Sequence, residues 1–542
     1  MRSHRAGVGI VAALAATLIA YGSAAADTNA DPVNDDQATI SYNQTEPANP
    51  LIPGNTTEVG GISVVGSLFK GLVEYDAKTA APTNAVAESI RTSDSKVYRI
   101  RLKPGWTFHD GTPVTAKSFV DAWNYTAYAP NKMLGATYLS PIKGFKRANS
   151  VAPGAKRPAA RTMSGLKVVD DRTFVVTLSA PFSEFATRLG YAAFFPLPAS
   201  FFADRKAFEA HPVGNGPFRF VSYTPGKDLV VKRYDAFGGE RKPHIGGIDF
   251  RFYKNLDDAY ADVVADKLDY LSFTPWSSTV NDKFKTDLPE TRRARYEYLG
   301  YQAIAFPVFD ERYADVRLRR AISMAIDRVD LIKQVFNGAR APADGLVAPN
   351  VQGHRDNQCG KLCTYRPKTA RRLFEASGFR GPIKLTSNID SANQKWMEVT
   401  CASIQKTLGR TCKFVPQPTL GQFRKQLDDR TINAIYRSAW VADYPSIENF
   451  LNPLFRTGGA SNVGKYSNHA VDVLLTRADA ARSEREGHWL YQKAERLVLR
   501  DMPTVPIWWQ SATAAWSSRL HNVTPTQFRE LDLYTVTVSK AG

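Results

Sequence analysis

Cysteine is scarce in this sequence, with only four among 542 residues. Cys359 and Cys363 enclose a Gly-Lys-Leu turn, and Cys401 and Cys412 are separated by a predicted helix end with Gly409. These spacings do not match structural zinc sites, although a metal site built from all four thiolates remains the alternative. An even number of cysteines in an exported chain indicates two local disulfides, one within each of these pairs.

Long apolar runs are missing after the first residues, which excludes a membrane-spanning helix from the rest of the chain. Arg2 and Arg5 precede an apolar run from Val8 to Ala20, and small residues follow as far as Ala26. This pattern is typical of a secretory signal peptide over residues 1–26, cleaved near Ala26. No cysteine lies near that site, so we expect an exported protein, periplasmic or secreted to the cell envelope, without a lipid anchor on an N-terminal Cys.

Acidic residues are missing from Ala122 to Val169, in a chain whose net charge is +18. Removal of residues 1–26 takes away two arginines and no acid, which leaves +16. The stretch forms either a solvated surface loop or a contact surface for an anionic envelope polymer or an acidic partner. Nucleic acid is not expected as a partner, because the exported chain has no nucleic-acid-binding motif. The basic residues of the stretch are Lys132, Lys143, Lys146, Arg147, Lys156, Arg157, Arg161 and Lys167.

Motifs of catalysis are also missing: the sequence has no P-loop, no H-E-x-x-H and no G-x-S-x-G. Gly214 and Gly216 are followed by Pro217, which breaks a dinucleotide fingerprint and indicates a turn. Ser93-x-x-Lys96 resembles a serine acyl-enzyme pattern but has no companion K-T-G motif, so a solvated turn explains it better. The eight histidines have no metal-ligand spacing. We therefore expect neither an enzyme nor a bound cofactor or metal.

What the sequence does contain is an alternation of helix and strand patterns, which predicts an α/β fold. Period-two alternation predicts strands over Val97–Leu102 and Phe174–Leu178, and Thr115 is a credible N-cap for a helix. In the second half, apolar residues at helical spacing predict one helix over Val316–Phe336 and others over Trp396–Leu408 and His488–Leu499. At this length at least two lobes are expected. Further strands are predicted at Ile383–Thr386, Cys412–Pro416, Ala434–Arg437 and Val505–Trp508.

Several short stretches occur in a shared order along the chain, and together they resemble the extracellular solute-binding proteins of family 5, the oligopeptide- and dipeptide-binding proteins of ABC importers. The N-terminal stretches are L-F-K-G-L at Leu68–Leu72, A-E-S at Ala87–Ser89 and W-T-F-H-D-G-T-P-V-T-A at Trp106–Ala116. The middle stretches are P-V-G-N-G-P-F at Pro212–Phe218 and D-V-R-L-R-R-A-I-S-M-A-I-D-R at Asp315–Arg328. The C-terminal stretches are W-V-A-D-Y-P at Trp440–Pro445, Y-S-N at Tyr466–Asn468 with Asp472, and V-P-I-W-W at Val505–Trp509.

The resemblance implies a two-lobed clamp of the periplasmic-binding-protein type (type II-like), with an extra subdomain inserted in the first lobe. After the signal peptide, the division expected is residues 27–69 and 191–297 for lobe I, 70–190 for the inserted subdomain, 298–507 for lobe II, and 508–542 for the return to lobe I. Tyr298–Phe306 and Pro506–Ala512 are the expected crossings between the lobes.

The resemblance also implies residues that bind the ligand. Asp443 matches the aspartate that binds a ligand amine, and Arg437 matches an arginine that binds the carboxylate of short ligands. Their alternatives are a turn Asp before Pro445 and a strand-surface Arg paired with an acid. Trp440 and Tyr444 are expected to form flat walls, and a bend after Arg437 is needed for Arg437, Trp440 and Asp443 all to face the ligand. Trp276, Trp396 and Trp508 are further wall candidates, with the core as their alternative.

Three more ligand contacts are carried over from the resemblance. Glu58 and Val59 fall where relatives pair a strand with the ligand backbone, and Tyr138 lies near the position of a tyrosine from the inserted subdomain. The function expected is binding of short peptides by hinge closure and delivery to an ABC permease, by a monomer. The alternatives are a same-fold binder of an oligosaccharide, a metal chelate or an amino-acid or guanidino metabolite, and a secreted sensor or scavenger.

Overall fold

The computed structural model describes residues 35–279, 282–389 and 393–539. The predicted signal peptide, residues 1–26, lies outside these ranges. Within them, no helix is both long and apolar enough to span a membrane. They also contain no group of three or more His, Cys, Asp or Glu side chains able to hold a metal ion.

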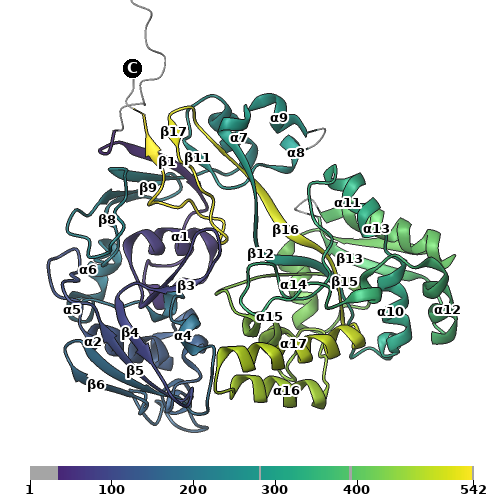
Figure 1. Ribbon diagram of the computed structural model, residues 1–542, viewed down its shortest axis with the longest axis horizontal. Helices are drawn as coiled ribbons and strands as arrows, with labels where there is room; N and C mark the ends of the chain where they lie inside the picture. Colours follow the sequence, from purple (N-terminus) through teal and green to yellow (C-terminus); the bar gives the residue numbers. More distant parts are fainter. Residues whose placement is uncertain (1–34, 280–281, 390–392, 540–542) are drawn as a thin grey trace, which may run out of the picture.

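The molecule has two halves, each with its own hydrophobic core, joined by two long strands (Figure 1). The core of the first half is built mainly from residues between Ile40 and Phe250 and from C-terminal residues between Ala514 and Val538. The core of the second half is built almost entirely from residues between Leu299 and Trp509. Two cores in an α/β chain confirm the predicted fold class. The six-segment division of the chain stays a prediction, which this separation of the cores supports.

A single sheet of ten strands runs through both halves, in the order β14-β13-β15-β12-β16-β11-β1-β10-β9-β8. Parallel pairs, β1 with β10 and β13 with β14, occur in both halves. The strands are β1 (Thr39–Gln44), β8 (Phe218–Thr224), β9 (Asp228–Arg233), β10 (Gly247–Phe252), β11 (Tyr270–Leu271), β12 (Arg293–Ala305), β13 (Ile383–Asn388), β14 (Cys412–Gln417), β15 (Ile435–Val441) and β16 (Thr504–Trp516).

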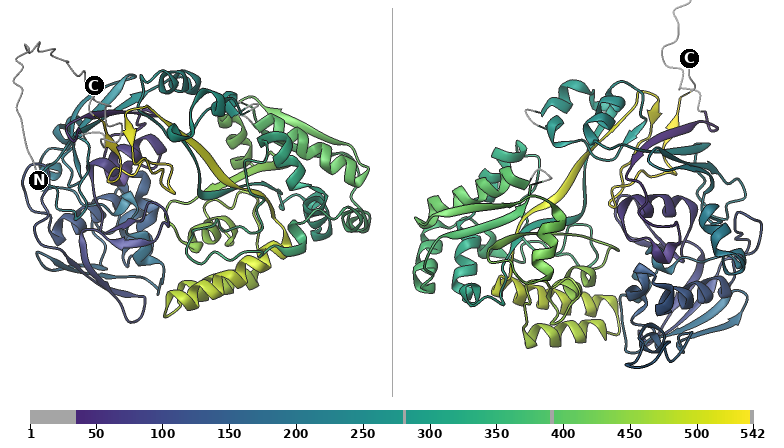
Figure 2. Two further views of the ribbon diagram at one scale, coloured as in Figure 1. Left: turned by 45° about the horizontal axis from the view of Figure 1, so that its top comes forward. Right: turned by 180° about the vertical axis from the view of Figure 1, so that it is seen from behind.

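Strands β12 and β16 connect the halves, and each is 13 residues long. They pair antiparallel, first from Arg293 to Glu297 and again from Tyr301 to Ala305, with an irregularity between the two runs. Figure 2 shows the two strands passing from one half to the other, and their pairing is irregular between Glu297 and Tyr301 and again between Gln302 and Ala303. A break in the ladder at this point leaves fewer backbone hydrogen bonds to resist bending between the halves.

The first half also carries a four-stranded antiparallel sheet, in the order β4-β5-β7-β6. Strand β5 buries every second residue, as its alternating sequence predicts. Helix α2 begins after Thr115, which forms the expected N-terminal cap together with Ser118. These elements are β4 (Ala87–Arg91), β5 (Val97–Leu102), β6 (Leu166–Asp170), β7 (Thr173–Thr177) and α2 (Ala116–Ala127), with two hairpin strands, β2 (Val73–Tyr75) and β3 (Pro82–Asn84), beside them.

The one long helix expected over Val316–Phe336 is wrong, because the chain breaks at Ile326 and Asp327. Ile326 has an extended backbone, and the Asp327 side chain caps the second helix. The helices of the second half are α10 (Val316–Ala325), α11 (Arg328–Phe336), α12 (Pro367–Ser377), α13 (Asn393–Leu408), α14 (Leu420–Asp428), α15 (Ile447–Phe455), α16 (His469–Asp479) and α17 (Glu484–Asp501).

The remaining helices are short and belong mostly to the first half. They are α1 (Val59–Leu68), α3 (Phe145–Asn149), α4 (Phe185–Arg188), α5 (Ala199–Ala203), α6 (Arg205–Ala210), α7 (Leu256–Val264), α8 (Trp276–Thr279) and α9 (Lys283–Asp287), and two strands, β17 (Leu520–His521) and β18 (Thr537–Val538), form a small C-terminal ladder.

Both predicted disulfides are present and both lie in the second half. Cys359 is bonded to Cys363, and Cys401 of α13 is bonded to Cys412, the first residue of β14. The second bond ties the outermost strand of the large sheet to the helix that packs on it. The alternative of a metal site made of four thiolates is therefore wrong.

Candidate functional site

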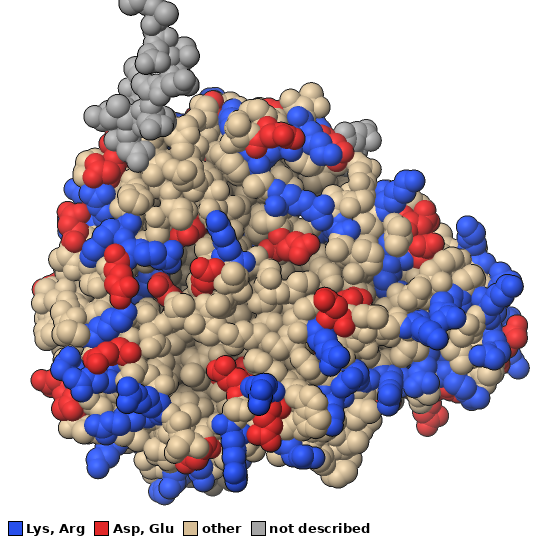
Figure 3. Space-filling model, in the orientation of Figure 1, with Lys and Arg blue, Asp and Glu red and all other residues tan. Residues whose placement is uncertain are grey.

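Two cavities lie between the halves and share one lining residue, Arg529. The first, which we call the α1 cavity, has a volume of about 420 Å³ and is lined by α1, β2, residues 441–443 and residues 526–534. The second, the β12–β16 cavity, has a volume of about 530 Å³ and is lined by residues within 273–279 and 282–285, by the crossing strands and by residues 336–340. Both are in the size range of small-molecule sites. The molecule is hollowed and largely uncharged where the halves meet, while Lys and Arg crowd the edge of the second half (Figure 3).

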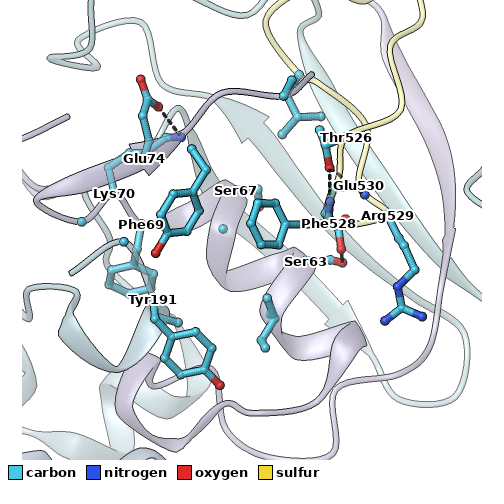
Figure 4. Close-up of a pocket in the computed structure, with 18 of the residues that line it drawn as sticks. Ser63, Ser67, Phe69, Lys70, Glu74, Tyr191, Thr526, Phe528, Arg529 and Glu530 are labelled. Atoms are coloured by element: carbon cyan, nitrogen blue, oxygen red, sulfur yellow. Dashed lines mark hydrogen bonds and ion pairs between the residues drawn. The ribbon is translucent and has the colours of Figure 1, made fainter. Parts of the chain in front are cut away.

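Helix α1 forms one wall of the α1 cavity because its small residues let it approach its neighbours closely. A side chain at Gly60 would meet the backbone oxygen of Thr45. On the cavity side, the Ser63 hydroxyl donates a hydrogen bond of 2.5 Å to Glu530, and Tyr42 donates to the same carboxylate at 2.8 Å. Figure 4 shows Ser63 and Glu530 beside Phe528, which projects into the cavity, whereas Arg529 points to the other side of the loop.

Asp443 lies on the wall of the α1 cavity contributed by the second half. Its carboxylate accepts a hydrogen bond from Asn449 at 3.1 Å, and its backbone N–H donates to the Asn449 amide oxygen at 3.0 Å. Burial raises the pKa of Asp443, while Asn449, Tyr138 and the more distant Arg188 act in the opposite direction. The structure thus holds a carboxylate that has lost much of its water, and no Lys, Arg or His among the described residues forms an ion pair with it.

Tyr138 and Tyr191 come from the first half and face Asp443. Their rings lie 4.2 Å apart, and the negative charge of Asp443 raises the pKa of both hydroxyls further, after the larger effect of burial. Tyr191 lines the α1 cavity, whereas Tyr138 is not among its lining residues. The sequence analysis named Tyr138 and missed Tyr191.

Tyr444 does not form a wall of either cavity, contrary to expectation, although it follows Asp443 directly. Its hydroxyl donates to Glu448 at 2.5 Å and accepts from Arg188 at 2.7 Å. Arg188 belongs to the first half and also lies 3.1 Å from Glu448. Tyr444 therefore takes part in a buried polar contact that joins the halves.

Arg437 and Trp440 lie on opposite faces of β15. The strand pairs with β12 from Tyr436 to Val441 without a bulge, so side chains alternate along it. The bend that would bring Arg437 and Trp440 to face one ligand is not present within this ladder. The Trp440 indole donates to Asn449, at 3.2 Å, and so supports the amide that holds Asp443.

Glu58 and Val59 are not in a strand. Glu58 caps α1, since its carboxylate accepts from the Gly61 N–H at 2.6 Å, and Val59 is the first residue of the helix. Val59 is 42% exposed and lines the α1 cavity, whereas Glu58 is not among its lining residues. Glu58 and Val59 therefore do not form the strand that was expected to pair with a ligand backbone.

The three tryptophans proposed as further walls, Trp276, Trp396 and Trp508, come together at the β12–β16 cavity. Trp396 and Trp508 meet edge to face with ring centroids 5.1 Å apart. Sequence reasoning missed the four arginines of this cavity, Arg293, Arg295, Arg340 and Arg529, and the C-terminal loop with Phe528. No local pattern marks these residues, because the C-terminal loop reaches the cavities only through distant contacts such as Leu299 N–H to Gln527 O.

Comparison with known proteins identifies the chain's family. The family model described as "Bacterial extracellular solute-binding proteins, family 5 Middle" matches residues 81–462. The chain belongs to this family. Its members are binding proteins, and the predicted resemblance is confirmed.

Relatives and solved structures of this family cover nearly the whole chain. The periplasmic oligopeptide-binding protein OppA of Salmonella typhimurium is 27% identical over 92% of this chain and 91% of its own length. The probable deoxycholate-binding periplasmic protein YgiS of Escherichia coli is also 27% identical, over 90% of each chain. The structure of the Escherichia coli murein tripeptide binding protein MppA aligns with a TM-score of 0.75, at 22% identity over 94% of this chain and 100% of its own. An unliganded open form of MppA aligns with a TM-score of 0.78, at 21% identity over 94% of this chain and 99% of its own. The likeness to MppA shows that the two proteins share a fold.

Proposed function

We propose that this family 5 protein binds short peptides between its halves and delivers them to an ABC permease, with Asp443 as the anchor for the ligand's amino group. The observation that carries the proposal is the state of Asp443: a carboxylate on a cavity wall, with a pKa raised by burial and no ion pair to any residue in the described part of the chain. A peptide ammonium would supply the missing positive charge, and the resulting charge-assisted hydrogen bond is among the strongest that proteins make.

The rest of the α1 cavity suits a ligand of varied side chains. Its walls include Phe69, Tyr191, Phe195 and Phe528, which offer apolar surface without fixed hydrogen-bond geometry. A site that fixes the amine and leaves the side chains in apolar space tolerates many sequences. Two of the relatives carry names that agree with this: OppA of Salmonella typhimurium is an oligopeptide-binding protein, and MppA is a murein tripeptide binding protein.

Under this proposal the protein is exported and carries no lipid anchor on an N-terminal Cys, acts as a monomer, and is not an enzyme. The irregular stretch between Glu297 and Tyr301 of β12 would serve as the hinge. Ligand binding would then shift the population toward a closed form that both halves contact.

Thermal unfolding of ligand-stripped protein tests the proposal. Pools of free two- to five-residue peptides, their N-acetylated counterparts and oligosaccharides are added in turn. At about a hundred times its Kd, a ligand adds roughly 2.7 kcal/mol of apparent stability. Stabilisation by free peptides and not by acetylated ones supports the amine anchor. Stabilisation only by oligosaccharides, or no response to any peptide, contradicts peptide binding.

A further inference from the structure

The β12–β16 cavity contains buried polar atoms that have no hydrogen-bond partner in the described part of the chain. They are the indole nitrogen of Trp508, the hydroxyl of Thr274, and the Nε atoms of Arg340 and Arg529. Trp508 is only 3% exposed and Thr274 is 9% exposed. Indole and guanidinium nitrogens can only donate, and a hydroxyl can do so as well. Unsatisfied buried donors are costly, so their gathering at one cavity indicates a ligand rich in acceptors.

The charges around the same cavity are strongly one-sided. Four arginines line it. Arg293 pairs with Glu290 at 3.6 Å, whereas Arg295, Arg340 and Arg529 form no ion pair with another described residue. The carboxylate of Asp282 also lines the cavity, but it is neutralised by Lys285 at 2.8 Å. Burial and the neighbouring charge of Arg295 lower the pKa of Arg340, effects that an anion beside it would offset.

Arg340 and Arg529 are held in place rather than free to swing into solvent. The Arg340 guanidinium donates to the Ser511 carbonyl oxygen at 2.6 Å and stacks over Phe336 at 4.5 Å. Arg529 lies over the ring of Tyr298 at 5.4 Å. Fixed guanidinium groups are well suited to carboxylates, which they bind through two parallel hydrogen bonds.

We infer that the β12–β16 cavity is an anion-binding subsite that makes this protein selective for acidic peptides. The inference rests on the proposed function, and it adds a ligand class to it. A peptide with a neutral side chain brings one carboxylate at its C-terminus, whereas three arginines without acidic partners line this cavity. A peptide that ends in Asp or Glu brings two carboxylates. The C-terminal loop that carries Arg529 also borders the α1 cavity with Asp443, so the two cavities lie on either side of one loop.

Calorimetric titration of ligand-stripped protein with four peptides tests the inference: Ala-Ala-Glu, Ala-Ala-Gln, and the C-terminal amides of both. We expect Ala-Ala-Glu to bind about tenfold or more tightly than Ala-Ala-Gln. The preference should shrink below about threefold in Arg340→Gln and in Arg529→Gln, and persist in Arg317→Gln, an exposed arginine paired with Asp315. Arg529→Gln decides the matter if Arg340→Gln fails to fold.

The amides separate the two sources of carboxylate. A Glu preference that survives C-terminal amidation supports recognition of the acidic side chain, whereas a loss of affinity on amidation with no Glu-over-Gln preference overturns the inference and leaves only capture of the C-terminus. Equal binding of all four peptides overturns the inference while the proposed function stands.

A non-peptide probe covers the case in which no peptide binds and the proposed function fails. Glutarate carries two carboxylates, and its monoamide carries one. Thermal stabilisation by millimolar glutarate, weaker with the monoamide and lost in Arg529→Gln, would support the anion-binding subsite without a peptide. No difference between glutarate and its monoamide would overturn it.

Discussion

The guanidinium of Arg188 and the carboxylate of Glu448 lie 3.1 Å apart, in a buried contact between the two halves of the molecule. Their side chains are only 10% and 4% exposed. Tyr444 completes the group through hydrogen bonds to both. This contact joins the halves beside the cavity wall that carries Asp443.

Replacement of Arg188 by Met should open the contact. It leaves Glu448 buried without a cation, a change that costs roughly 3–5 kcal/mol in typical proteins. We expect a lower free energy of unfolding in urea and a larger radius of gyration in small-angle scattering with saturating ligand. Arg205→Met, which removes an exposed pair with Glu209, should change stability by about 1 kcal/mol or less. Equal effects of the two variants would contradict the role given to Arg188.

Stability should fall as the pH rises from about 5 to 8. Burial raises the pKa of Glu495 to about 7, although the carboxylate accepts a hydrogen bond from the Leu346 N–H. The folded state therefore holds this proton more tightly than the unfolded state. Its stabilising effect is complete below the unfolded pKa of about 4.3 and is lost as the pH rises through 7.

His488 acts in the same direction. Burial lowers its pKa, but contact with Glu184 across the halves outweighs burial and raises it. Urea unfolding at several pH values checks the trend, and Glu495→Gln should flatten it while the exposed Glu209→Gln leaves it unchanged. Stability that rises between pH 5 and 8 would contradict these assignments.

Loss of the Cys401–Cys412 disulfide should weaken the second half. The bond closes a loop with a sequence separation of 11, for which the chain-entropy account gives about 3 kcal/mol. The double variant Cys401→Ser and Cys412→Ser should therefore unfold at lower temperature, with a larger loss than the corresponding variant of Cys359 and Cys363, whose separation is 4. The reverse order would show that loop length does not decide the effect.

Arg328 should be indispensable for the junction between α10, α11 and the crossing strand β16. It is 3% exposed and donates to the oxygens of Pro506, at 2.8 Å, and of Ser323, at 3.1 Å. Arg328→Met removes these bonds and leaves buried carbonyls unsatisfied, with an expected loss of roughly 2–4 kcal/mol in the free energy of unfolding. Arg320→Met is the control, since Arg320 is more exposed and donates only to the Arg500 carbonyl among the described residues. A loss no larger than in this control would contradict the role of Arg328.

The sequence predicts those parts of the fold that depend on local chemistry. The cap at Thr115, the alternation of β5 and the two disulfides follow from nearby residues and are confirmed. The predicted helix over Val316–Phe336 is wrong because a capping aspartate, Asp327, starts a new helix within an unbroken apolar pattern. Periodicity does not register such a break, since both helices keep their apolar faces toward one core.

The candidate site is less predictable because it is assembled from distant segments. Asp443 is named by its motif, and it lies on a cavity wall as the resemblance implies. Its neighbour Tyr444 turns into the contact with Arg188, a residue 256 positions away in the sequence. The arginines of the β12–β16 cavity come from three separate segments, and only the folded chain brings them together.

Isothermal titration with one free tripeptide and its N-acetylated form, on wild type and Asp443→Asn, tests the amine anchor most directly. Asn keeps the shape of Asp443 and can still pair with Asn449, so a change in affinity reports the charge. The account predicts that acetylation weakens binding to wild type by about a hundredfold or more, and that it has little effect on Asp443→Asn, which binds both forms weakly. Equal sensitivity to acetylation in the two proteins would show that Asp443 does not hold the ligand's amino group.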